Sequence, residues 1–535
     1  MALRMMQITK GAMILLSATA YIWWICQESA WLSALPLAAI GSSTQSSSLS
    51  YAVTAHPVLK NTIRPGELPG YTGWARPTTT LANSFRIHRP YPISAQAGSR
   101  WTCSVHCSHA LCATGGSLFY TRAYGPSVLP GLITDHHNGT YDVTFLPMDE
   151  GLYTVEVVLT FSTPPPFAAF PLPKFSEPGY EGYQLPEFPI SLVVETADTS
   201  SARARLAAED GSLPLCTMSD LLESSPTSGI ETGRWLVHDK IIERVFNISK
   251  STNEVTLDGY RRGDNSLGIK MDFYPAECSL LSEAECKDRA YVKKALQESK
   301  RDNSRELHLL MIGDSNMRIQ SEMARDENFL LSNGPDRITY ISTHGGLYTA
   351  LPSVASHLAQ IFDYDKDRNT DHVVIFNSGL QELVYFCGSN YFGVDLTIRD
   401  RGTGPCTDAY RRVVTEFVEL IQQIPSILTI FQTTPAAWPK WGLYGGLWPA
   451  EVLQPMPYCP DFVDHFNQIV WQILKQKEIM TMDAYFLTLS RPDHREVLTA
   501  SGHELSARLA HAGPEVYTVL VRMWTSMIHE RLKVF

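Results

Sequence analysis

The chain has 535 residues, of which 44% are hydrophobic and 19% charged, a balance that supports a sizeable core and excludes wholesale disorder. The 44 basic and 55 acidic residues give a formal net charge of -11. No long run of lysine or arginine relieves this charge, so nucleic acid is excluded as an expected partner.

The first residues predict a membrane anchor. Arg4 and Lys10 precede an uncharged stretch at 11–27, which approaches the shortest length that spans a bilayer. Because positive charge stays on the cytosolic side, we expect a cytosolic tail at 1–10 and a transmembrane signal anchor at 11–32, with the rest of the chain lumenal, as in a type II membrane protein. A cleaved signal peptide, which would give a secreted protein, and a buried helix are the alternatives.

Two features support a lumenal location. The tripeptides that begin at Asn138 and Asn247 are potential N-glycosylation acceptors. Nine of the ten cysteines follow the predicted anchor; in an oxidising compartment they are expected to form disulfides, with at least one left over. A metal site remains an alternative for one cluster, composed of Cys103, His106, Cys107, His109 and Cys112.

A stem and a β-sandwich are predicted after the anchor. Residues 33–65 contain a Ser/Thr-rich run and are expected to form a flexible stem. Alternating apolar and polar residues then predict a sandwich of about seven strands at 66–197. The clearest strands are 141–145, 152–161 and 190–195, and the proline-rich segment 164–189 is expected to be a loop.

A polar linker is predicted at 198–232 and an α/β domain at 233–535. Short apolar runs alternate there with amphipathic helices, which indicates a parallel sheet with helices on both faces. The expected strands are 307–312, 338–342, 372–376, 426–431 and 479–486. The expected helices include 408–424 and 461–476.

Polar residues follow three consecutive predicted strands. Gly313-Asp314-Ser315 follows the first strand, Gly345 the second and Asn377 the third. Ligands in such folds bind at the carboxyl ends of the strands, so we expect a nucleophilic serine, a backbone N–H donor and an amide donor to meet there. The alternative is that Asp314 or Ser315 only caps the following helix.

A nucleophilic serine requires a base, and the C-terminal region supplies the candidates. His511 precedes Ala-Gly-Pro and the last predicted helix, so a loop placement would let it reach the end of the first strand. The other candidates are His494 and His503 as the base and Asp483 and Asp493 as the carboxylate.

These motifs resemble a known family. Gly313-Asp314-Ser315-Asn316-Met317-Arg318, the Asn377-Ser378-Gly379 loop and the late histidine resemble the PC-esterase branch of the SGNH/GDSL superfamily, together with GRWL at 233–236 and FYPAEC at 273–278. NGTYDVTFLPMDEGLYTVEVVL, from residue 138, resembles half of a filamin-type immunoglobulin repeat. Anchor, sandwich and esterase in this order resemble the neurexophilin and PC-esterase domain (NXPE) family, whose core is shared with trichome-birefringence-like and Cas1-like glycan O-acetyltransferases.

The resemblance implies roles for single residues. Ser315 resembles the acyl-accepting nucleophile, Gly345 and Asn377 the oxyanion donors, and His511 the base. Arg318 resembles an arginine that could orient Asp314 or a substrate carboxylate. Two positions depart from the family pattern, because Arg508 stands where an aspartate often precedes the histidine, and Gln381 where a histidine often follows the NxG glycine. The acid is therefore open, with Asp493 as the first choice.

The resemblance implies a Golgi or secretory-pathway glycan O-acyltransferase that forms an acyl-serine. Acetyl-CoA or another acetyl carrier would be the donor substrate, no cofactor or metal would be permanently bound, and a glycan or polysaccharide would be the acceptor. A glycan acetylesterase of the same fold and a non-catalytic glycan- or protein-binding ectodomain are the alternatives.

Two further groups have ordinary structural explanations. The tryptophans at 438, 441 and 448 could stack on sugar rings, but aromatic residues beside glycine and proline more often pack a long loop. Asp363, Asp365 and Asp367 resemble part of a calcium loop, but its glycine and distal glutamate are missing, so a solvated turn is expected.

Overall fold

The computed structural model describes residues 81–88, 91–161, 180–195, 213–221, 233–237, 271–275, 278–287, 306–326, 337–366, 368, 370–383, 406–436, 460–477, 479–490, 495–500, 503–512 and 514–534. None of the helices among these residues is both long and apolar enough to cross a bilayer. The predicted anchor, the stem, Asn247 and the three loop tryptophans lie outside the described residues.

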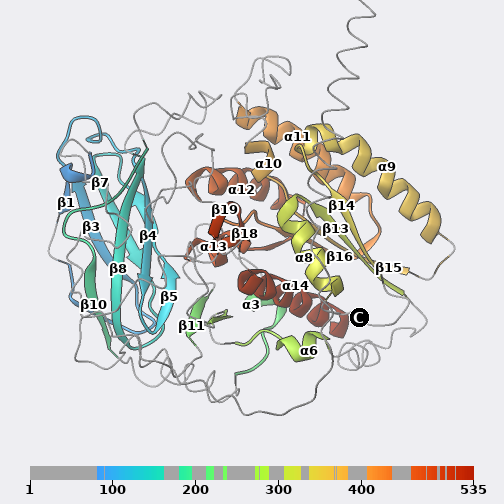
Figure 1. The fold of residues 1–535 in the computed structure, drawn as a ribbon, viewed down its shortest axis with the longest axis horizontal. Coiled ribbons are helices and arrows are strands. Elements are labelled where there is room, and N and C mark those ends of the chain that lie inside the picture. The colour runs from blue at the N-terminus through green and yellow to red at the C-terminus, as the bar shows by residue number, and fades with distance from the viewer. Residues whose placement is uncertain are drawn as a thin grey trace, which may run out of the picture. The chain divides into compact units, whose positions relative to one another are not determined.

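The first part of the described chain is all β, as expected (Figure 1). After a short 3-10 helix η1 (Leu81–Ser84), one sheet has the order β1 (Phe85–Ile87), β3 (Trp101–Cys107), β7 (Thr140–Phe145), β6 (Leu132–Asp135). The other has the order β12 (Met271–Tyr274), β11 (Arg234–Val237), β5 (Ser127–Pro130), β4 (Leu118–Tyr124), β8 (Gly151–Phe161), β10 (Ile190–Glu195), β2 (Ser94–Gln96), with β9 (Tyr180–Gln184) beside β8.

Side-chain alternation makes these two sheets a sandwich. The strand β3 buries every second residue, as a strand with one face in a core must. Val105 and Val143 of one sheet share a hydrophobic cluster with Val155 and Leu159 of the other. The sequence pattern therefore predicted the layered β region, although it underestimated the number of strands. Two of the additional strands, β11 and β12, come from residues that the sequence assigned to the α/β domain at 233–535.

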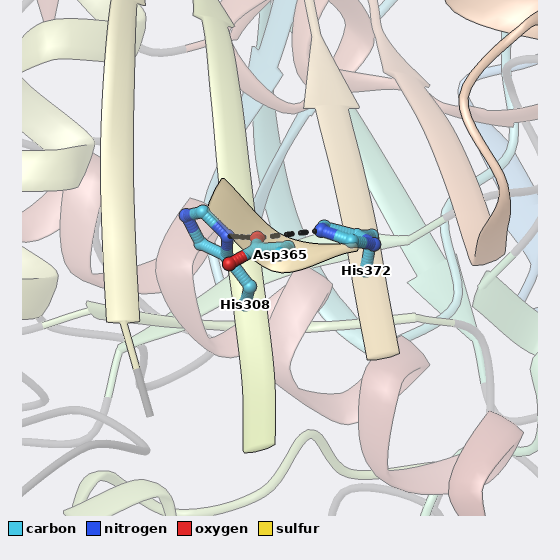
Figure 2. Close-up of side chains that lie close together, drawn as sticks. All are labelled: His308, Asp365 and His372. Atoms are coloured by element: carbon cyan, nitrogen blue, oxygen red, sulfur yellow. Dashed lines mark hydrogen bonds and ion pairs between the residues drawn. The ribbon is translucent and has the colours of Figure 1, made fainter. Parts of the chain in front are cut away.

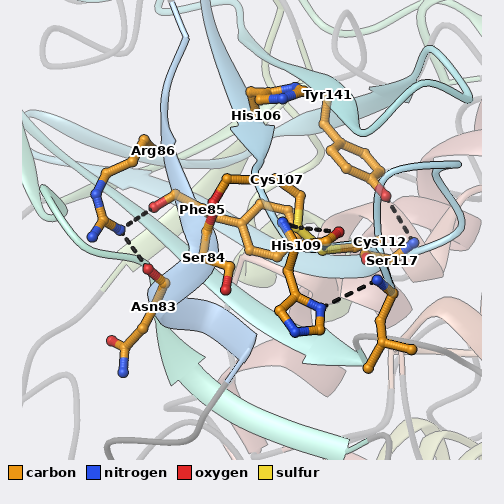
Figure 3. Close-up of a disulfide and its surroundings, with 12 residues drawn as sticks. Asn83, Ser84, Phe85, Arg86, His106, Cys107, His109, Cys112, Ser117 and Tyr141 are labelled. Carbon is orange, nitrogen blue, oxygen red and sulfur yellow. Dashed lines mark hydrogen bonds between the residues drawn. A yellow bond between two sulfur atoms is a disulfide. The ribbon is translucent and has the colours of Figure 1, made fainter.

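The cysteines of this region form a disulfide rather than a metal site. Cys107 and Cys112 are bonded beside Tyr141, as Figure 3 shows. The ring of His109 accepts the N–H of Leu111 at 3.2 Å, and Cys103 is a buried free thiol. Burial raises the pKa of that thiol to about 12, so it stays protonated. The metal alternative is wrong for this cluster.

Two segments differ from the predicted loops. The proline-free residues 180–184 form β9 within the proline-rich segment, because a run without proline can supply the N–H groups that a sheet requires. Part of the predicted linker is folded as well. Cys216 is disulfide-bonded to Cys278, and α3 (Met218–Leu221) packs on α14 (Pro514–Val534).

The first acceptor asparagine lies at the surface. Asn138 is exposed in the turn between β6 and β7, where its side-chain oxygen accepts the N–H of Thr140 at 3.0 Å. Its glycosylation stays a prediction.

The second part is built on a five-stranded parallel sheet, as predicted. The order is β14 (Arg337–Ser342), β13 (Glu306–Gly313), β15 (Thr370–Phe376), β16 (Ser426–Gln432), β17 (Met480–Met482). All eight residues of β13 are buried, as expected for a strand covered on both faces. The helices are α8 (Ser315–Asp326), α9 (Leu347–Asp365), α10 (Leu380–Glu382), α11 (Cys406–Gln422), α12 (Pro460–Leu474), α13 (Ala484–Leu489) and α14.

Two hydrophobic clusters cover the two faces of this sheet. Leu309 and Met311 of β13 join the cluster formed by α8 and α14, whereas Leu310 and Ile312 join that of α9, α11 and α12. Figure 1 shows these helices around the strands. The two-residue period of a strand assigns alternate side chains to opposite faces, which makes this part a three-layer α/β structure.

The fifth strand is shorter than predicted. The run 479–486 reads as one apolar strand, but β17 ends at Met482 and α13 begins at Ala484. Asp483 causes the change, because its carboxylate caps the helix by accepting the N–H of Phe486 at 2.9 Å.

Candidate active site

The carboxyl end of the sheet contains a topological switch point. The first strand in the chain, β13, lies between the second, β14, and the third, β15. The helix after β13 packs on one face of the sheet and the helix after β15 on the other. Ligands of open α/β sheets bind in the crevice that such diverging connections leave. The loops at this point carry Ser315 and Asn377.

Ser315 is the first residue of α8, and Asp314 caps the helix. Oδ1 of Asp314 accepts the N–H of Asn316 at 2.9 Å. Asp314 is buried and Ser315 is partly exposed. Of the two residues that could cap the helix, Asp314 is the one that does so. Ser315 lies in the first helical turn, where backbone N–H groups and the helix dipole favour a nearby anion.

Asn377 holds the turn around Asp314. Its side-chain oxygen accepts the N–H of Asp314 at 3.2 Å, and its Nδ2 donates to Oδ1 of Asp314 at 3.1 Å. These two bonds fix the orientation of the amide. One hydrogen of Nδ2 is used in this pair, so the other is the one that could serve an oxyanion, as the sequence predicted for this residue.

The close approach of β13 and β15 requires a glycine. A Cβ at Gly313 would lie 1.8 Å from Oδ1 of Asn377. The hydroxyl of Tyr340 supports the same turn by donating to the carbonyls of Gly313 and Asp314, both at 3.0 Å. Two features therefore fix the spacing of the two strand-end loops: the absence of a side chain at Gly313 and the hydrogen bonds that Tyr340 donates.

Gly345 lies on the third loop of the site. Gly345 and Gly346 both have positive φ, 87° and 86°, a conformation that favours glycine. The loop ends where α9 begins, and the N–H of Leu347 donates to Oε1 of Glu382 at 2.6 Å. Oε2 of Glu382 accepts the N–H of Gly379 at 2.8 Å. One carboxylate thus joins the Gly345 loop to the Asn377 loop.

Sequence reasoning missed Glu382. The available signal was its position three residues after Gly379, the spacing at which a glutamate bonds back to the start of a helix. It is 1% exposed. Burial, opposed by its backbone hydrogen bonds and assisted by the charge of Asp314, raises the pKa of Glu382 to about 7. Nearby, burial holds the pKa of Tyr410 well above its usual range, and its hydroxyl bonds Oγ of Ser378 at 2.8 Å.

The predicted base does not lie in a loop. His511 is the next-to-last residue of the strand β19 (His503–Ala512), which pairs with β18 (Arg495–Ala500). This strand contacts α8, the helix that Ser315 begins. The next helix also reaches the site, since the hydroxyl of Tyr517 donates to Oδ1 of Asn316 at 2.6 Å. The strand that carries His511 therefore contacts the helix that begins at the predicted nucleophile.

The other candidates are distributed differently. His503 begins β19, while Asp493 and His494 lie outside the described residues. Asp483 follows β17, three strands from β13, which is about 14 Å at ~4.8 Å per strand. Its carboxylate accepts from Phe486 and Thr433, and burial raises its pKa to about 6. That separation makes Asp483 unsuitable as the partner of a base at Ser315.

Arg318 does not contact Asp314. Its guanidinium donates to both carboxylate oxygens of Glu322, at 2.8 and 3.0 Å, one turn further along α8. Both side chains are more than one-third exposed. The prediction that Arg318 orients Asp314 is therefore wrong, because Asn377 is the residue that bonds Asp314.

The opposite, amino end of the sheet has a buried cluster that was predicted as a solvated turn. Asp365, at the end of α9, is 5% exposed. Its Oδ2 bonds Nδ1 of His308 and Nε2 of His372, each at 3.0 Å, as Figure 2 shows. Its Oδ1 accepts from Arg337. The signal in the sequence was one histidine inside each of two apolar strands, since a buried imidazole requires a partner.

This cluster can be tested as a metal centre. The ligand atoms of His308, Asp365 and His372 lie within 4.8 Å of one another. However, Arg337 already pairs with Asp365 and with Glu306, and Arg368 lies 3.8 Å from Glu306. Two carboxylates face two guanidiniums, so their charges balance without an ion. A divalent cation would add uncompensated buried charge, and we interpret the cluster as structural.

Comparison with known proteins adds little to this picture. No protein-family model matches the sequence, and no curated protein matches it. Among solved structures, the crystal structure of the Lin-41 filamin domain is similar at 14% identity over 21% of this chain and 94% of that chain, with a TM-score of 0.16. A score this low carries no argument about fold or function, so the interpretation depends on the geometry above.

Proposed function

We propose that this protein is a glycan O-acyltransferase, most readily an acetyltransferase, that works through an acyl-Ser315 intermediate in the Golgi or another secretory-pathway lumen. The observation that supports the proposal is that Ser315, Gly345 and Asn377 follow the carboxyl ends of three neighbouring strands, β13, β14 and β15, at the switch point. The lumenal location and the glycan acceptor derive from the predicted anchor, the acceptor asparagines and the resemblance to glycan O-acetyltransferases.

The reaction would proceed in two steps. Oγ of Ser315 attacks the acyl carbonyl carbon of the donor while His511 accepts its proton, and the oxyanion is stabilised by the backbone N–H groups of Ser315 and Gly345 and by the amide of Asn377. Collapse breaks the bond to the donor, whose leaving group takes the proton from the imidazole. A sugar hydroxyl then attacks the acyl-serine while His511 accepts its proton. Collapse breaks the bond between Oγ of Ser315 and the acyl carbon, His511 returns the proton to Oγ, and the acylated glycan is released.

A glycan acetylesterase shares these steps, with water in place of the sugar hydroxyl. The donor, such as acetyl-CoA, is a substrate in the transferase and is replaced by the acetylated glycan in the esterase. The specific observation that favours a third candidate, a non-catalytic binding ectodomain, is the pairing of Asn377 with Asp314, because an amide used to hold a turn has a sufficient structural role.

The decisive experiment is trapping of the acyl-enzyme. Purified protein is incubated with acetyl-CoA or p-nitrophenyl acetate, quenched in acid and digested, and the peptide with Ser315 is examined by mass spectrometry. We expect one acetyl group on Ser315, its absence in Ser315→Ala, and no change in the control Ser353→Ala, which alters an exposed serine of α9. The acetyl-enzyme is then given water alone or water with a glycan. Release of free acetate indicates an esterase, and appearance of acetylated glycan indicates a transferase.

Loss of the nucleophile should reduce the rate by several orders of magnitude. A folded Ser315→Ala protein that still transfers or hydrolyses acetyl groups would exclude the covalent mechanism. A wild-type protein that takes no acetyl group from either donor, but binds glycans, would favour the binding ectodomain.

A further inference from the structure

Glu382 has a place in the site that the proposed reaction does not yet use. Its two carboxylate oxygens bond two different loops, with Leu347 N–H on Oε1 at 2.6 Å and Gly379 N–H on Oε2 at 2.8 Å. Leu347 is two residues after Gly345, and Gly379 is two residues after Asn377. One side chain thus bridges the two loops that carry the predicted oxyanion donors.

Backbone conformation alone does not fix these loops. Gly345, Gly346 and Gly379 all have positive φ, and glycine is the residue with the largest range of backbone conformations. A Cβ on Gly345 would meet just one atom within 4 Å, Oγ1 of Thr349 at 3.1 Å. An acceptor that binds both loops therefore removes freedom that their sequences leave open.

We propose that Glu382 is the positioning residue of the Ser315 site, and that its ionised carboxylate holds the Gly345 and Asn377 loops at the spacing an oxyanion requires; this inference rests on the proposed function. Protonation leaves one good acceptor oxygen and converts the other into a hydroxyl, so one of the two loops is released. The site then loses oxyanion stabilisation but keeps its nucleophile and base.

The surroundings of Glu382 make this protonation accessible. In the described part of the chain, the titratable groups that act on it are Asp314, in the turn after β13, and Tyr410, on α11. Neither supplies positive charge, and burial is the largest cause of the pKa of about 7. The N–H groups of Leu347 and Gly379 favour the ionised form of Glu382. Their two hydrogen bonds to its carboxylate, which we call the clamp, therefore form as pH rises through neutrality.

The test compares Glu382→Gln with the control Glu419→Gln, a change at an exposed carboxylate of α11. Acetyl-enzyme formation from p-nitrophenyl acetate is measured between pH 5 and 9, with the folded state checked by thermal unfolding. We expect the variant to lower kcat by about 10- to 100-fold with little change in KM, because misplacement of reacting groups by about 1 Å has that effect. In the plot of kcat against pH, the change near pH 7 that Glu382 causes should disappear. The change caused by protonation of the base, His511, should remain.

A second measurement reports the clamp without reference to activity. Hydrogen exchange of the peptides that cover 343–352 and 376–383 should show protected Leu347 and Gly379 amides at pH 8. Protection corrected for intrinsic exchange should fall for one of these two amides at pH 5.5 in the wild type. In Glu382→Gln one of the two amides should lack protection at both pH values, because the amide side chain keeps only one acceptor oxygen.

The outcomes separate the two proposals. If Ser315 is never acylated but the pH-dependent protection is present, the proposed function fails and the clamp stands as a structural feature. If Ser315 is acylated with the same kcat and pH profile in Glu382→Gln, or if protection does not depend on Glu382, the positioning role is wrong.

Discussion

The two ends of the parallel sheet both bury carboxylates, but they bind them with different partners. At the amino end, Asp365 is bonded by the guanidinium of Arg337 and the imidazoles of His308 and His372. At the carboxyl end, Asp314 and Glu382 accept hydrogen bonds from backbone N–H groups and from an amide. The described residues give neither of these two a salt bridge.

This difference fits a structural role for the amino end and the catalytic role proposed for the carboxyl end. A buried carboxylate paired with cations is neutralised, whereas one held by neutral dipoles keeps its charge and its cost of desolvation. One oxygen of Asp314, Oδ2, is buried without a hydrogen-bond partner among the described residues. Natural proteins depart from good polar pairing mainly where function requires it, and Oδ2 of Asp314, one of several such atoms among the described residues, lies at the switch point.

The largest expected effect is at the amino end. Asp365→Ala leaves two imidazoles and Arg337 without their shared acceptor, and breaking a buried pair in this way costs about 3–5 kcal/mol of unfolding free energy. Urea denaturation measures it. Asp363→Ala, two residues earlier and exposed, is the matched control and should change stability by less than ~0.5 kcal/mol. A similar loss in both variants would contradict the buried network.

Overpacking of the carboxyl end comes next. Gly313→Ala places a Cβ where Oδ1 of Asn377 now lies, which should cost about 1–3 kcal/mol. Because the same amide is displaced, acyl transfer should fall as far as in Asn377→Ala, by roughly 100-fold. Denaturation and acetylation assays check the two effects. A Gly313→Ala protein with normal stability would show that the two loops are not held as closely as described.

The pH dependence of stability has opposite signs at the two ends. The folded-state pKa of Glu382 is raised to about 7, so its contribution is present below the unfolded value and is lost as pH rises from about 4.5 to 7, by at most about 1.4 kcal/mol per pH unit. Glu382→Gln should remove this slope in urea unfolding. At the amino end, burial lowers the pKa of His308, so its contribution is lost as pH falls below about 6.5. A wild type and Glu382→Gln with parallel curves would contradict the raised pKa.

Replacing a single buried aspartate by asparagine should change the free energy of unfolding in opposite directions at the two ends of the sheet. Asp314→Asn keeps an acceptor for Asn316 and removes an incompletely paired buried charge, so we expect stability to stay the same or rise by up to ~1 kcal/mol while acyl transfer falls. Asp365→Asn should be destabilising, because its new NH2 group faces donors. Thermal unfolding of both variants makes the comparison, and destabilisation of similar size in both would erase the distinction.

The smallest effect is expected at Arg318. Its pair with Glu322 is exposed and within one helix, so Arg318→Ala should change unfolding free energy by less than ~0.5 kcal/mol. Acyl-enzyme formation measures its other possible role. A large loss of acylation with normal stability would show that Arg318 binds substrate, as one sequence-based expectation allows.

The local pattern of the sequence determined much of the fold. Continuous apolar runs such as 307–312 predicted strands covered on both faces, and alternation predicted β10 with its observed bounds, Ile190–Glu195. The short motif Gly313-Asp314-Ser315 identified the strand end at the switch point, because a glycine followed by small polar residues is interpretable without knowing what lies next to it. The same locality explains the error at 479–486, where one capping aspartate ends an apolar run.

Only the tertiary structure decided which side chains share a partner. From the sequence, Asp365 is predicted to lie in a solvated turn, but the fold places it between His308 and His372. Glu382 has the pattern of an ordinary helical glutamate, and only the position of α9 shows that it bonds the N–H of Leu347. Hydrogen bonds and ion pairs between residues far apart in the chain depend on strand order and helix placement, which periodicity does not encode. The sequence therefore determined the layers and the candidate nucleophile, and the packing of β13, β14 and β15 determined how each buried charge is held.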